Sequence, residues 1–356
     1  MKLLNLKKGR KGENSMEDRK IVLDAKGIKK YFPITSSFFK RHVGDVYAVD
    51  DVDVYVREGE TLGIVGESGC GKTTLGRTIL RAIQPTDGTC NFVKKNGETV
   101  DIFKLNETEL REARRDMQMI FQDPYASLNP RMIIKDIIGE PLKYNSSLTN
   151  AEITERVKEL LDLVGLNPRH LERYPHAFSG GQRQRIGIAR ALATTPQFIV
   201  CDEAVSALDV SVQAQVINLL QKLQSKMNLS YMFISHDLSV IQHLSDRVGV
   251  MYVGKMVEQA TSADLFRRPL HPYTEALLSA KPLADPRLKK DKILLEGETP
   301  NPANPPSGCY FHPRCRYKCD ICKQERPKYR ELEKGHFVAC HRAEELELKG
   351  VYGTQQ

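Results

Sequence analysis

Apolar and polar positions divide the chain into strand-like and helix-like segments. Residues 20–33 and 46–56 alternate apolar and polar side chains, which predicts half-buried antiparallel strands joined by a loop. The run at 61–65, TLGIV, is apolar throughout and predicts a strand buried on both faces. The runs at 197–202 and 231–235 predict two further buried strands. Together they indicate an α/β protein with a mixed sheet and an antiparallel part near the N-terminus.

Helical and irregular segments complete this picture. Residues from about 105 to 190 are charged and carry apolar side chains at helical spacing, as at Val157, Leu160 and Val164, which predicts a helical subdomain. After about residue 275 the chain becomes rich in Pro, Lys and Gly. Such composition is typical of a surface linker, and it leads into a cysteine-rich tail.

Composition narrows the class of protein. The 356 residues are 40% hydrophobic and 28% charged, as in globular proteins, and no window reaches the ~18 consecutive apolar residues of a membrane span. Residues 1–19 are basic and polar without an apolar stretch, so we expect a disordered arm and no signal peptide, with Met16 as an alternative start. The net charge of +8 is spread along the chain, which argues against a nucleic-acid-binding surface.

A glycine-rich segment follows the predicted strand at 61–65. It fits the pattern G-x-x-x-x-G-K-[ST], in which glycines let backbone N–H groups surround an anion and a helix N-terminus faces the phosphates. Lys72 would reach the β- and γ-phosphate oxygens, and Thr73 would offer a hydroxyl to Mg²⁺. The alternative, a strand–helix turn without a ligand, is disfavoured by the strand before it and the helix after it. The expected phosphate-binding residues are Gly66, Glu67, Ser68, Gly69, Cys70, Gly71, Lys72, Thr73 and Thr74.

The second half of an ATP site is expected where a buried strand ends in acids. The strand at 197–202 ends on Asp202, and Glu203 follows it. Asp202 would orient Mg²⁺ and its waters, and Glu203 would polarise the attacking water. The alternative is a polar loop after a core strand, but two acids after so apolar a run are less common in such a loop.

A third motif points to one family of ATPases. Residues 178–182, FSGGQ, followed by the helical RQRIGIARAL, resemble the LSGGQ signature of the ABC (ATP-binding cassette) family. The motif order also resembles that family over about residues 20–260. Gln122 in MIFQDP resembles the Q-loop glutamine, residues 206–209 resemble the D-loop, and His236 resembles the switch histidine.

The resemblance implies a role for each motif. In the family the signature, here Ser179, Gly180, Gly181 and Gln182, contacts the γ-phosphate of ATP held by a partner cassette, so two cassettes close head to tail. Gln122 would reach Mg²⁺ or the attacking water, and His236 would hold the γ-phosphate and support Glu203. The resemblance also places the D-loop Asp209 at the nucleotide. Lys72, Gln122, Glu203 and His236 are the expected catalytic residues, and Thr73, Gln122 and Asp202 the expected Mg²⁺ ligands.

Two further points concern the edges of this site. The family's adenine-stacking aromatic falls on Phe32 by its distance from the GIKK strand, while Tyr31 and Tyr47 remain alternatives. Ala204 stands where many cassettes have proline, and Ala177 where peptide importers often have glutamate. The second difference would affect coupling to membrane subunits without touching the phosphates.

Less universal segments indicate the branch of the family. Residues 121–130 (FQDPYASLNP), 271–280 (HPYTEALLSA) and 305–315 (PPSGCYFHPRC) resemble the oligopeptide/dipeptide importers, and the insertion near 36–50 favours their F-type subunit. The resemblance implies a second ATPase subunit, two transmembrane permeases and an extracytoplasmic peptide-binding protein, at the cytoplasmic face of the membrane. Nickel or sugar import remains an alternative, and a soluble ABC ATPase, a non-hydrolysing regulatory cassette and a kinase are less favoured rivals.

Five of the eight cysteines crowd into the tail. In a reducing compartment such a cluster points to metal rather than disulfides. From spacing alone, a tetrahedral zinc and a [4Fe–4S] cluster are both open, as are free thiols. The peptide-importer resemblance favours a [4Fe–4S] cluster with zinc as the alternative. The expected ligands are Cys309, Cys315, Cys322 and Cys340, with Cys319 as the alternative.

These observations predict an α/β P-loop ABC ATPase cassette with a small cysteine-rich extension. The expected nucleotide-binding domain covers residues 20–265, including the helical subdomain at about 105–190. The expected peptide-importer-type C-terminal region covers residues 266–356.

Overall fold

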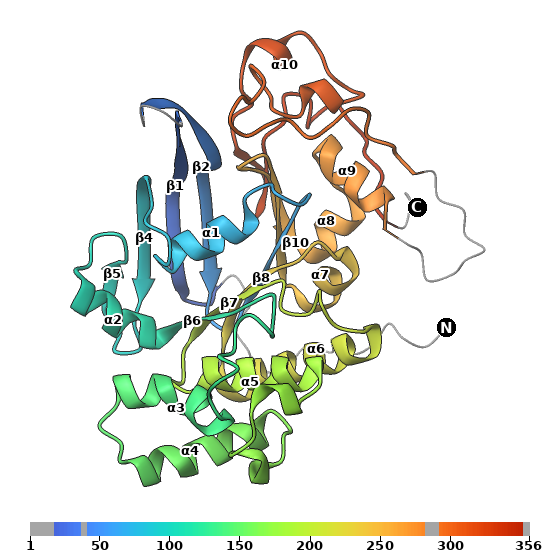
Figure 1. The fold of residues 1–356 in the computed structure, drawn as a ribbon. Helices are drawn as coiled ribbons and strands as arrows, with labels where there is room; N and C mark the ends of the chain where they lie inside the picture. The colour runs from blue at the N-terminus through green and yellow to red at the C-terminus, as the bar shows by residue number, and fades with distance from the viewer. Residues whose placement is uncertain (1–17, 37–40, 282–291, 352–356) are drawn as a thin grey trace.

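The computed structural model describes residues 18–36, 41–281 and 292–351. Two sheets form the centre of the molecule, with a helical part at one end and a C-terminal region beside the sheets (Figure 1). No helix in these ranges is both long and apolar enough to cross a membrane. The predicted arm at residues 1–19 lies almost entirely outside the described residues.

The smaller sheet is antiparallel and has the order β2-β1-β4-β5. Its long pair confirms the two alternating segments of the sequence, although β2 begins at His42, within the segment predicted as a loop. Alternate residues of this pair, such as Leu23, Ala25 and Val54, are fully buried because one face packs on the core. The strands are β1 (Ile21–Thr35), β2 (His42–Arg57), β4 (Asp87–Val93) and β5 (Thr99–Asp101).

The larger sheet has the order β11-β12-β10-β9-β3-β8-β7-β6. Its central strands are parallel, and β10, β12 and β11 add to it antiparallel, which confirms the predicted mixed sheet. The three predicted apolar strands are buried along their whole length, since helices or the smaller sheet cover both faces. The strands are β3 (Thr61–Val65), β6 (Met117–Ile120), β7 (Phe198–Asp202), β8 (Ser230–Ile234), β9 (Arg247–Tyr252), β10 (Lys255–Thr261), β11 (Arg330–Glu333) and β12 (His336–Val338).

Two hydrophobic cores lie on opposite faces of the larger sheet. Helix α1 contacts β1, β2, β7 and β8, so it lies between the two sheets in the core that contains Ile64 and Val200. Helix α2 adds Leu110 and Ala113 to this core, whereas on the other face Ile199 and Phe233 pack with the helices from α3 to α9. Successive strand residues point to opposite faces, and the parallel strands therefore supply both cores. The helices outside the helical part are α1 (Lys72–Ile79), α2 (Glu107–Asp116), α6 (Val210–Met227), α7 (Leu238–Leu244), α8 (Ser262–Arg267), α9 (Pro272–Ser279) and α10 (Ile321–Gln324).

The helical part is built from α3 (Ile134–Asn145), α4 (Asn150–Leu163) and α5 (Gly180–Leu192). These three helices contact one another and bury Ile138 together with Val157 and Leu160, two of the helically spaced apolar residues named from the sequence. Within the range predicted to be helical, residues 117–120 instead form the edge strand β6. Its pairing with β7 overrides the helical character of the residues around it.

The C-terminal region is anchored by a buried carboxylate. Glu258 on β10 is fully buried, and it accepts hydrogen bonds from the backbone N–H groups of Leu270 and His271. Nε2 of His336, on β12, lies 2.7 Å from the same carboxylate. Because a buried charge is tolerated only when it is fully hydrogen-bonded, this cluster fixes the start of α9 and β12 relative to β10.

Candidate nucleotide-binding site

The glycine-rich loop joins the end of β3 to the start of α1, as the sequence predicts (Figure 1). Gly66 and Gly71 have φ angles of 152° and 102°, in the left-handed region that favours glycine. A Cβ at Gly66 would lie 2.2 Å from the carbonyl oxygen of Met251, and one at Gly71 2.0 Å from that of Ala48. The loop is therefore pressed against β2 and β9, and only glycine fits at these two positions.

Lys72 is buried at the centre of this loop. Its Nζ donates hydrogen bonds to the carbonyl oxygens of Gly66, at 2.8 Å, and Glu67, at 2.9 Å. As the first residue of α1, it also stands at the positive end of that helix. An ammonium and free helix N–H groups converging on one loop form an anion-binding site of the kind that phosphates occupy.

A hydroxyl and a carboxylate meet next to the loop. Thr73 Oγ1 donates to Asp202 Oδ1 at 2.7 Å, across the gap between α1 and the end of β7. Asp202 is only 1% exposed, and its Oδ2 has no hydrogen-bond partner, although Arg77 Nη2 lies 3.7 Å away. Burial raises the pKa of Asp202 above its usual value. An orphaned buried oxygen beside a hydroxyl is a donor set that suits Mg²⁺, which takes oxygen ligands.

Glu203 lies between two of the other predicted residues. Its Oε2 accepts a hydrogen bond from Gln122 Nε2 at 2.8 Å and lies 3.3 Å from His236 Nδ1. Its backbone has a φ of 47°, a left-handed conformation that costs free energy for a residue with a side chain. A hydrogen bond from its N–H to the carbonyl of Ile234 holds this conformation. The fold thus brings an amide, a carboxylate and an imidazole together from three separate segments, next to Asp202.

The signature segment lies in a different environment. Ser179 caps α5 in a capping box with Gln182, and both residues are exposed. A Cβ at Gly181 would lie 2.3 Å from Val212, so the start of α5 packs closely on α6. Asp209 is exposed at the start of α6, and Val210 is 82% exposed. Predicted residues Ser179, Gly180, Gly181, Gln182 and Asp209 therefore lie on a surface formed by the first turns of α5 and α6.

The three candidate aromatic residues differ in their surroundings. The Tyr31 hydroxyl donates to Asp50 at 2.7 Å, and its ring contacts that of Tyr47 edge to face at 4.8 Å. Phe32 is 38% exposed, and Lys30 is the cation that lies over its ring. All three rings therefore have a neighbour, and Phe32 is the most exposed of the three residues.

The structure brings three residues to the loop that sequence reasoning did not assign to it. Arg314 makes two hydrogen bonds to the carboxylate of Glu67, Thr299 makes a third, and the Tyr273 hydroxyl accepts one from the Glu67 N–H. Arg314 belongs to the HPRC segment, which the sequence analysis used for the importer resemblance and for its cysteine, without a role for the arginine. Thr299 lies in the segment read as a surface linker, where composition carries no sign of a docking contact.

The four predicted cysteine ligands surround one small cavity. Cys309, Cys315, Cys322 and Cys340 line a space of about 20 Å³ together with Phe311 and Tyr317. Burial raises the pKa of Cys309 to about 11 and that of Cys340 to about 12. Cys319 Sγ lies 3.4 Å from Cys322 Sγ but does not line the cavity. Among the described residues, no three His, Cys, Asp or Glu side chains converge on the position of a single metal ion.

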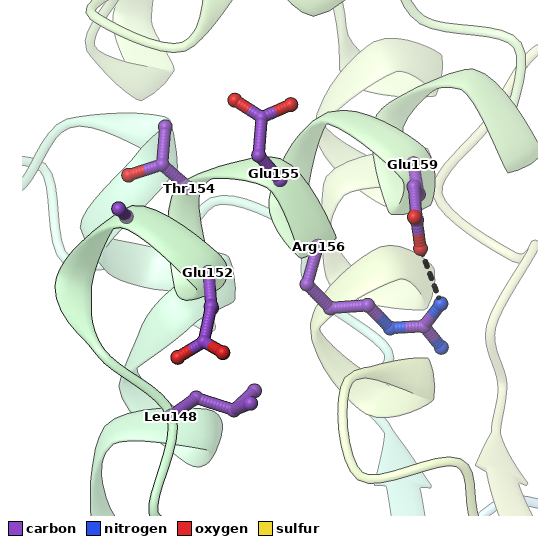
Figure 2. Close-up of a pocket in the computed structure, with 7 residues that line it drawn as sticks. Leu148, Glu152, Thr154, Glu155, Arg156 and Glu159 are labelled. Atoms are coloured by element: carbon purple, nitrogen blue, oxygen red, sulfur yellow. Dashed lines mark hydrogen bonds and ion pairs between the residues drawn. The ribbon is translucent and has the colours of Figure 1, made fainter.

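A larger hollow lies elsewhere, on α4 in the helical part. It has a volume of about 610 Å³ and is lined by Leu148, Glu152, Glu155, Arg156 and Glu159, among others (Figure 2). Arg156 is paired with Glu159 at 2.8 Å, and the acids point outward from the helix (Figure 2). None of the predicted site residues lines this hollow.

The site combines a phosphate-binding loop, a buried aspartate beside a threonine hydroxyl, and a glutamate between glutamine and histidine. This combination is typical of a P-loop nucleotide hydrolase. Comparison with known proteins identifies the family. The ABC transporter family model matches residues 49–206, and the model of the oligopeptide/dipeptide transporter C-terminal region matches residues 257–322. This chain belongs to the ABC transporter family of ATPases, in its branch of oligopeptide transport ATP-binding proteins.

Relatives along most of the chain support this assignment. The oligopeptide transport ATP-binding protein AppF of Bacillus subtilis is 55% identical over 91% of this chain and 98% of its own length. The oligopeptide transport ATP-binding protein OppF of Salmonella typhimurium is 50% identical over 93% of this chain and 99% of its own. Among solved structures, the ATP-binding cassette MJ0796, a dimer bound to ADP and phosphate, is 28% identical and superimposes with a TM-score of 0.58. That match covers 67% of this chain and 98% of MJ0796.

Proposed function

We propose that this chain hydrolyses ATP to power the import of dipeptides and oligopeptides across the cytoplasmic membrane, as one half of a pair of cassettes. The single observation that carries the hydrolytic part is the convergence of Gln122, Glu203 and His236 next to the Thr73–Asp202 pair. The transport part rests on the oligopeptide transport relatives and on the matching C-terminal region.

The mechanism follows from the positions of these residues. Lys72 and the N–H groups at the start of α1 bind the phosphates and offset charge as it develops on the γ-phosphoryl group. Thr73 and Asp202 would hold Mg²⁺, together with Gln122, which lies beside Glu203. When bound, the ion would neutralise charge at the β- and γ-phosphates. Glu203 accepts a proton from the attacking water, and His236 orients its carboxylate and faces the γ-phosphate.

The second half of the mechanism belongs to a partner cassette. Ser179, Gly180 and Gln182 present the N-terminus of α5 outward, and an exposed helix N-terminus attracts a phosphate. We propose that this surface and Asp209 close on ATP bound by a second, different ATPase subunit. Closure of such a dimer would reorient two transmembrane permeases at the cytoplasmic face of the membrane, with a peptide-binding protein on the other side.

We propose that residues 20–265 form the nucleotide-binding domain and that residues 266–356 form a C-terminal region of the peptide-importer type. Phe32 is the proposed adenine platform. It is the most exposed of the three aromatic residues, whereas the Tyr31 hydroxyl is bonded to Asp50.

We propose a [4Fe–4S] cluster at the four cysteines, with zinc as the alternative. A tetrahedral zinc with sulfur ligands at 2.3 Å brings the thiolates to about 3.8 Å from one another and converges them on one point. A four-iron cluster places iron and sulfide between the thiolates and so keeps them farther apart. Both groups take four cysteine thiolates, and Cys309, Cys315, Cys322 and Cys340 line one cavity. Iron and acid-labile sulfide analysis after anaerobic purification decides between the cluster, zinc and free thiols.

The test of the proposed function is the variant Glu203→Gln in the assembled transporter. We expect ATP turnover to fall by about 10³-fold or more, because the proton acceptor is removed, while nucleotide binding is retained and the dimer is trapped. Wild-type protein should co-purify with two membrane proteins, a second cassette and a peptide-binding protein. Unchanged turnover would refute the role of Glu203, and co-purification with ribosomes or DNA instead would refute the transport function.

A further inference from the structure

The C-terminal region holds one residue of the phosphate loop from several sides. Arg314 donates to both carboxylate oxygens of Glu67, through Nη1 at 2.8 Å and Nη2 at 3.1 Å. Thr299 Oγ1 donates to the same carboxylate at 2.7 Å, and the Glu67 N–H donates to the Tyr273 hydroxyl at 2.8 Å. Residues more than 200 positions away in the sequence thus bind both the side chain and the backbone N–H of Glu67.

Arg314 is itself held in a fixed position. Its side chain is 8% exposed, and Nη1 also lies 3.4 Å from the Tyr252 hydroxyl. It is the last residue of a short 3-10 helix, η4 (His312–Arg314), between Cys309 and Cys315, which line the cysteine cavity. The fork geometry of a guanidinium suits this two-point contact with a carboxylate.

The charge of Glu67 matters because of where it lies. Glu67 is the second residue of the loop, and its carbonyl oxygen accepts a hydrogen bond from Lys72 Nζ at 2.9 Å. Although partial burial opposes the effect, hydrogen bonds from Arg314 and Thr299 lower the pKa of Glu67, which keeps the carboxylate ionised. A carboxylate without its partner at this place would repel a polyanionic nucleotide, and the partly buried setting would screen that repulsion weakly.

We propose that Arg314 is a positioning residue for ATP binding, which neutralises Glu67 and ties the cysteine-lined C-terminal region to the phosphate loop. The inference rests on the proposed ATP site and adds to it a residue that is not part of the predicted ATP-binding motifs. It also gives the C-terminal region a direct effect on nucleotide affinity, since Arg314 sits on the segment that links two of the cavity cysteines.

A simpler role for Arg314 is to anchor the C-terminal region without influencing the nucleotide. The two roles predict opposite effects of a second substitution. If the unpaired charge of Glu67 is what weakens binding, then Glu67→Gln restores affinity in an Arg314→Ala background. If only anchoring matters, Glu67→Gln removes a further contact and restores nothing.

The experiment measures the affinity of the full-length chain for a fluorescent N-methylanthraniloyl ATP with Mg²⁺. We expect Arg314→Ala to weaken binding by about tenfold, within the range reported for residues that act through a neighbour. Arg314→Lys, which keeps the charge, should lose less. The double variant Arg314→Ala/Glu67→Gln should return to within about threefold of wild type, and the deficit of Arg314→Ala should shrink as salt is raised.

A matched control lies two residues away. Arg316 also comes from this segment and pairs with the buried Glu275 at 2.9 Å. Within the described part of the chain its hydrogen bonds go to Glu275 and Tyr317 and not to the loop. Arg316→Ala should leave nucleotide affinity unchanged. In the assembled transporter, Arg314→Ala should raise KM for ATP and leave kcat within about twofold, because Arg314 does not touch the reacting atoms.

The possible results distinguish a failure of the proposed function from a failure of the proposed role of Arg314. If the wild-type chain does not bind the nucleotide, the proposed function itself fails. If wild type binds and Arg314→Ala binds equally well, the inference about Arg314 is overturned. It is also overturned if Arg314→Ala is weak and the double variant is equally weak, since this is the result of anchoring alone. Should Arg314→Ala fail to fold, the folded Arg314→Lys and Glu67→Gln variants provide the same comparison.

Discussion

The phosphate loop and the signature surface contrast sharply within one chain. The loop is enclosed by its own fold, with Lys72 and Asp202 buried and the glycines pressed against neighbouring strands. The signature residue Ser179 and the nearby Val210 lie exposed on the first turns of α5 and α6. The fold completes one half of a nucleotide site and leaves the other half open. This difference is what the proposed function requires, because in it the enclosed loop binds one nucleotide and the open surface closes on a nucleotide held by a partner cassette.

The largest expected effect breaks the enclosed half. Lys72→Ala removes the ammonium at the centre of the loop and the charge-assisted contacts that it would make with phosphate oxygens. We expect nucleotide affinity of the isolated chain to fall by roughly 100-fold or more. Equilibrium binding of the fluorescent ATP analogue measures this. Circular dichroism provides the control, since Lys72→Ala should keep its secondary structure, and affinity within about threefold of wild type would contradict the role of Lys72.

The next effect breaks the exposed half and leaves the enclosed half intact. Ser179→Arg places a bulky side chain on the surface that would close on the partner's nucleotide. We expect turnover in the assembled transporter to drop by about 100-fold, because the signature's donors no longer reach the phosphate. The isolated chain should bind nucleotide as wild type does. If Ser179→Arg weakened that binding, the two halves would not be independent.

A smaller effect sharpens the description of the enclosed half. Asp202→Asn removes a buried charge with an oxygen that has no hydrogen-bond partner, while its remaining oxygen still accepts from Thr73. We expect the free energy of unfolding of the nucleotide-free chain to rise by roughly 1 kcal/mol, so that it unfolds at a higher temperature. The variant should also lose the Mg²⁺-dependent part of nucleotide binding. Calorimetry with and without Mg²⁺ tests both. If Asp202→Asn instead destabilised the nucleotide-free chain, the charge of Asp202 would be stabilised by its surroundings, which contradicts this expectation.

The smallest effect concerns pH at the edge of the loop. Hydrogen bonds to Glu67 lower its pKa against the opposing effect of burial, so this carboxylate stabilises the folded chain at pH values above its unfolded pKa. That contribution is lost as pH falls through the lowered folded value, in the range below about pH 4. The difference in melting temperature between wild type and Glu67→Gln should therefore be present at pH 7 and vanish toward the acid end. A difference that is independent of pH would exclude this ionisation.

Much of the fold followed from local pattern. The strands at 61–65, 197–202 and 231–235 were readable because strands covered on both faces must be apolar throughout. The short strand β6 was not readable, because its four residues lie among charged helical ones and only pairing with β7 defines it. Strands β11 and β12 were also missed. They form a short hairpin with each other, and only the pairing of β12 with the distant β10 joins that hairpin to the sheet.

The sequence by itself determined the chemistry of this protein: the loop from Gly66 to Thr73, the acids Asp202 and Glu203, the signature at Ser179 and the cysteines. Each of these depends on residue type at fixed spacing along a single segment. Only the tertiary structure decided which side chains meet. It places Glu203 between Gln122 and His236, and it brings Arg314 to Glu67. Contacts between segments far apart in sequence depend on how the strands order themselves in the sheet, and no local pattern encodes that order.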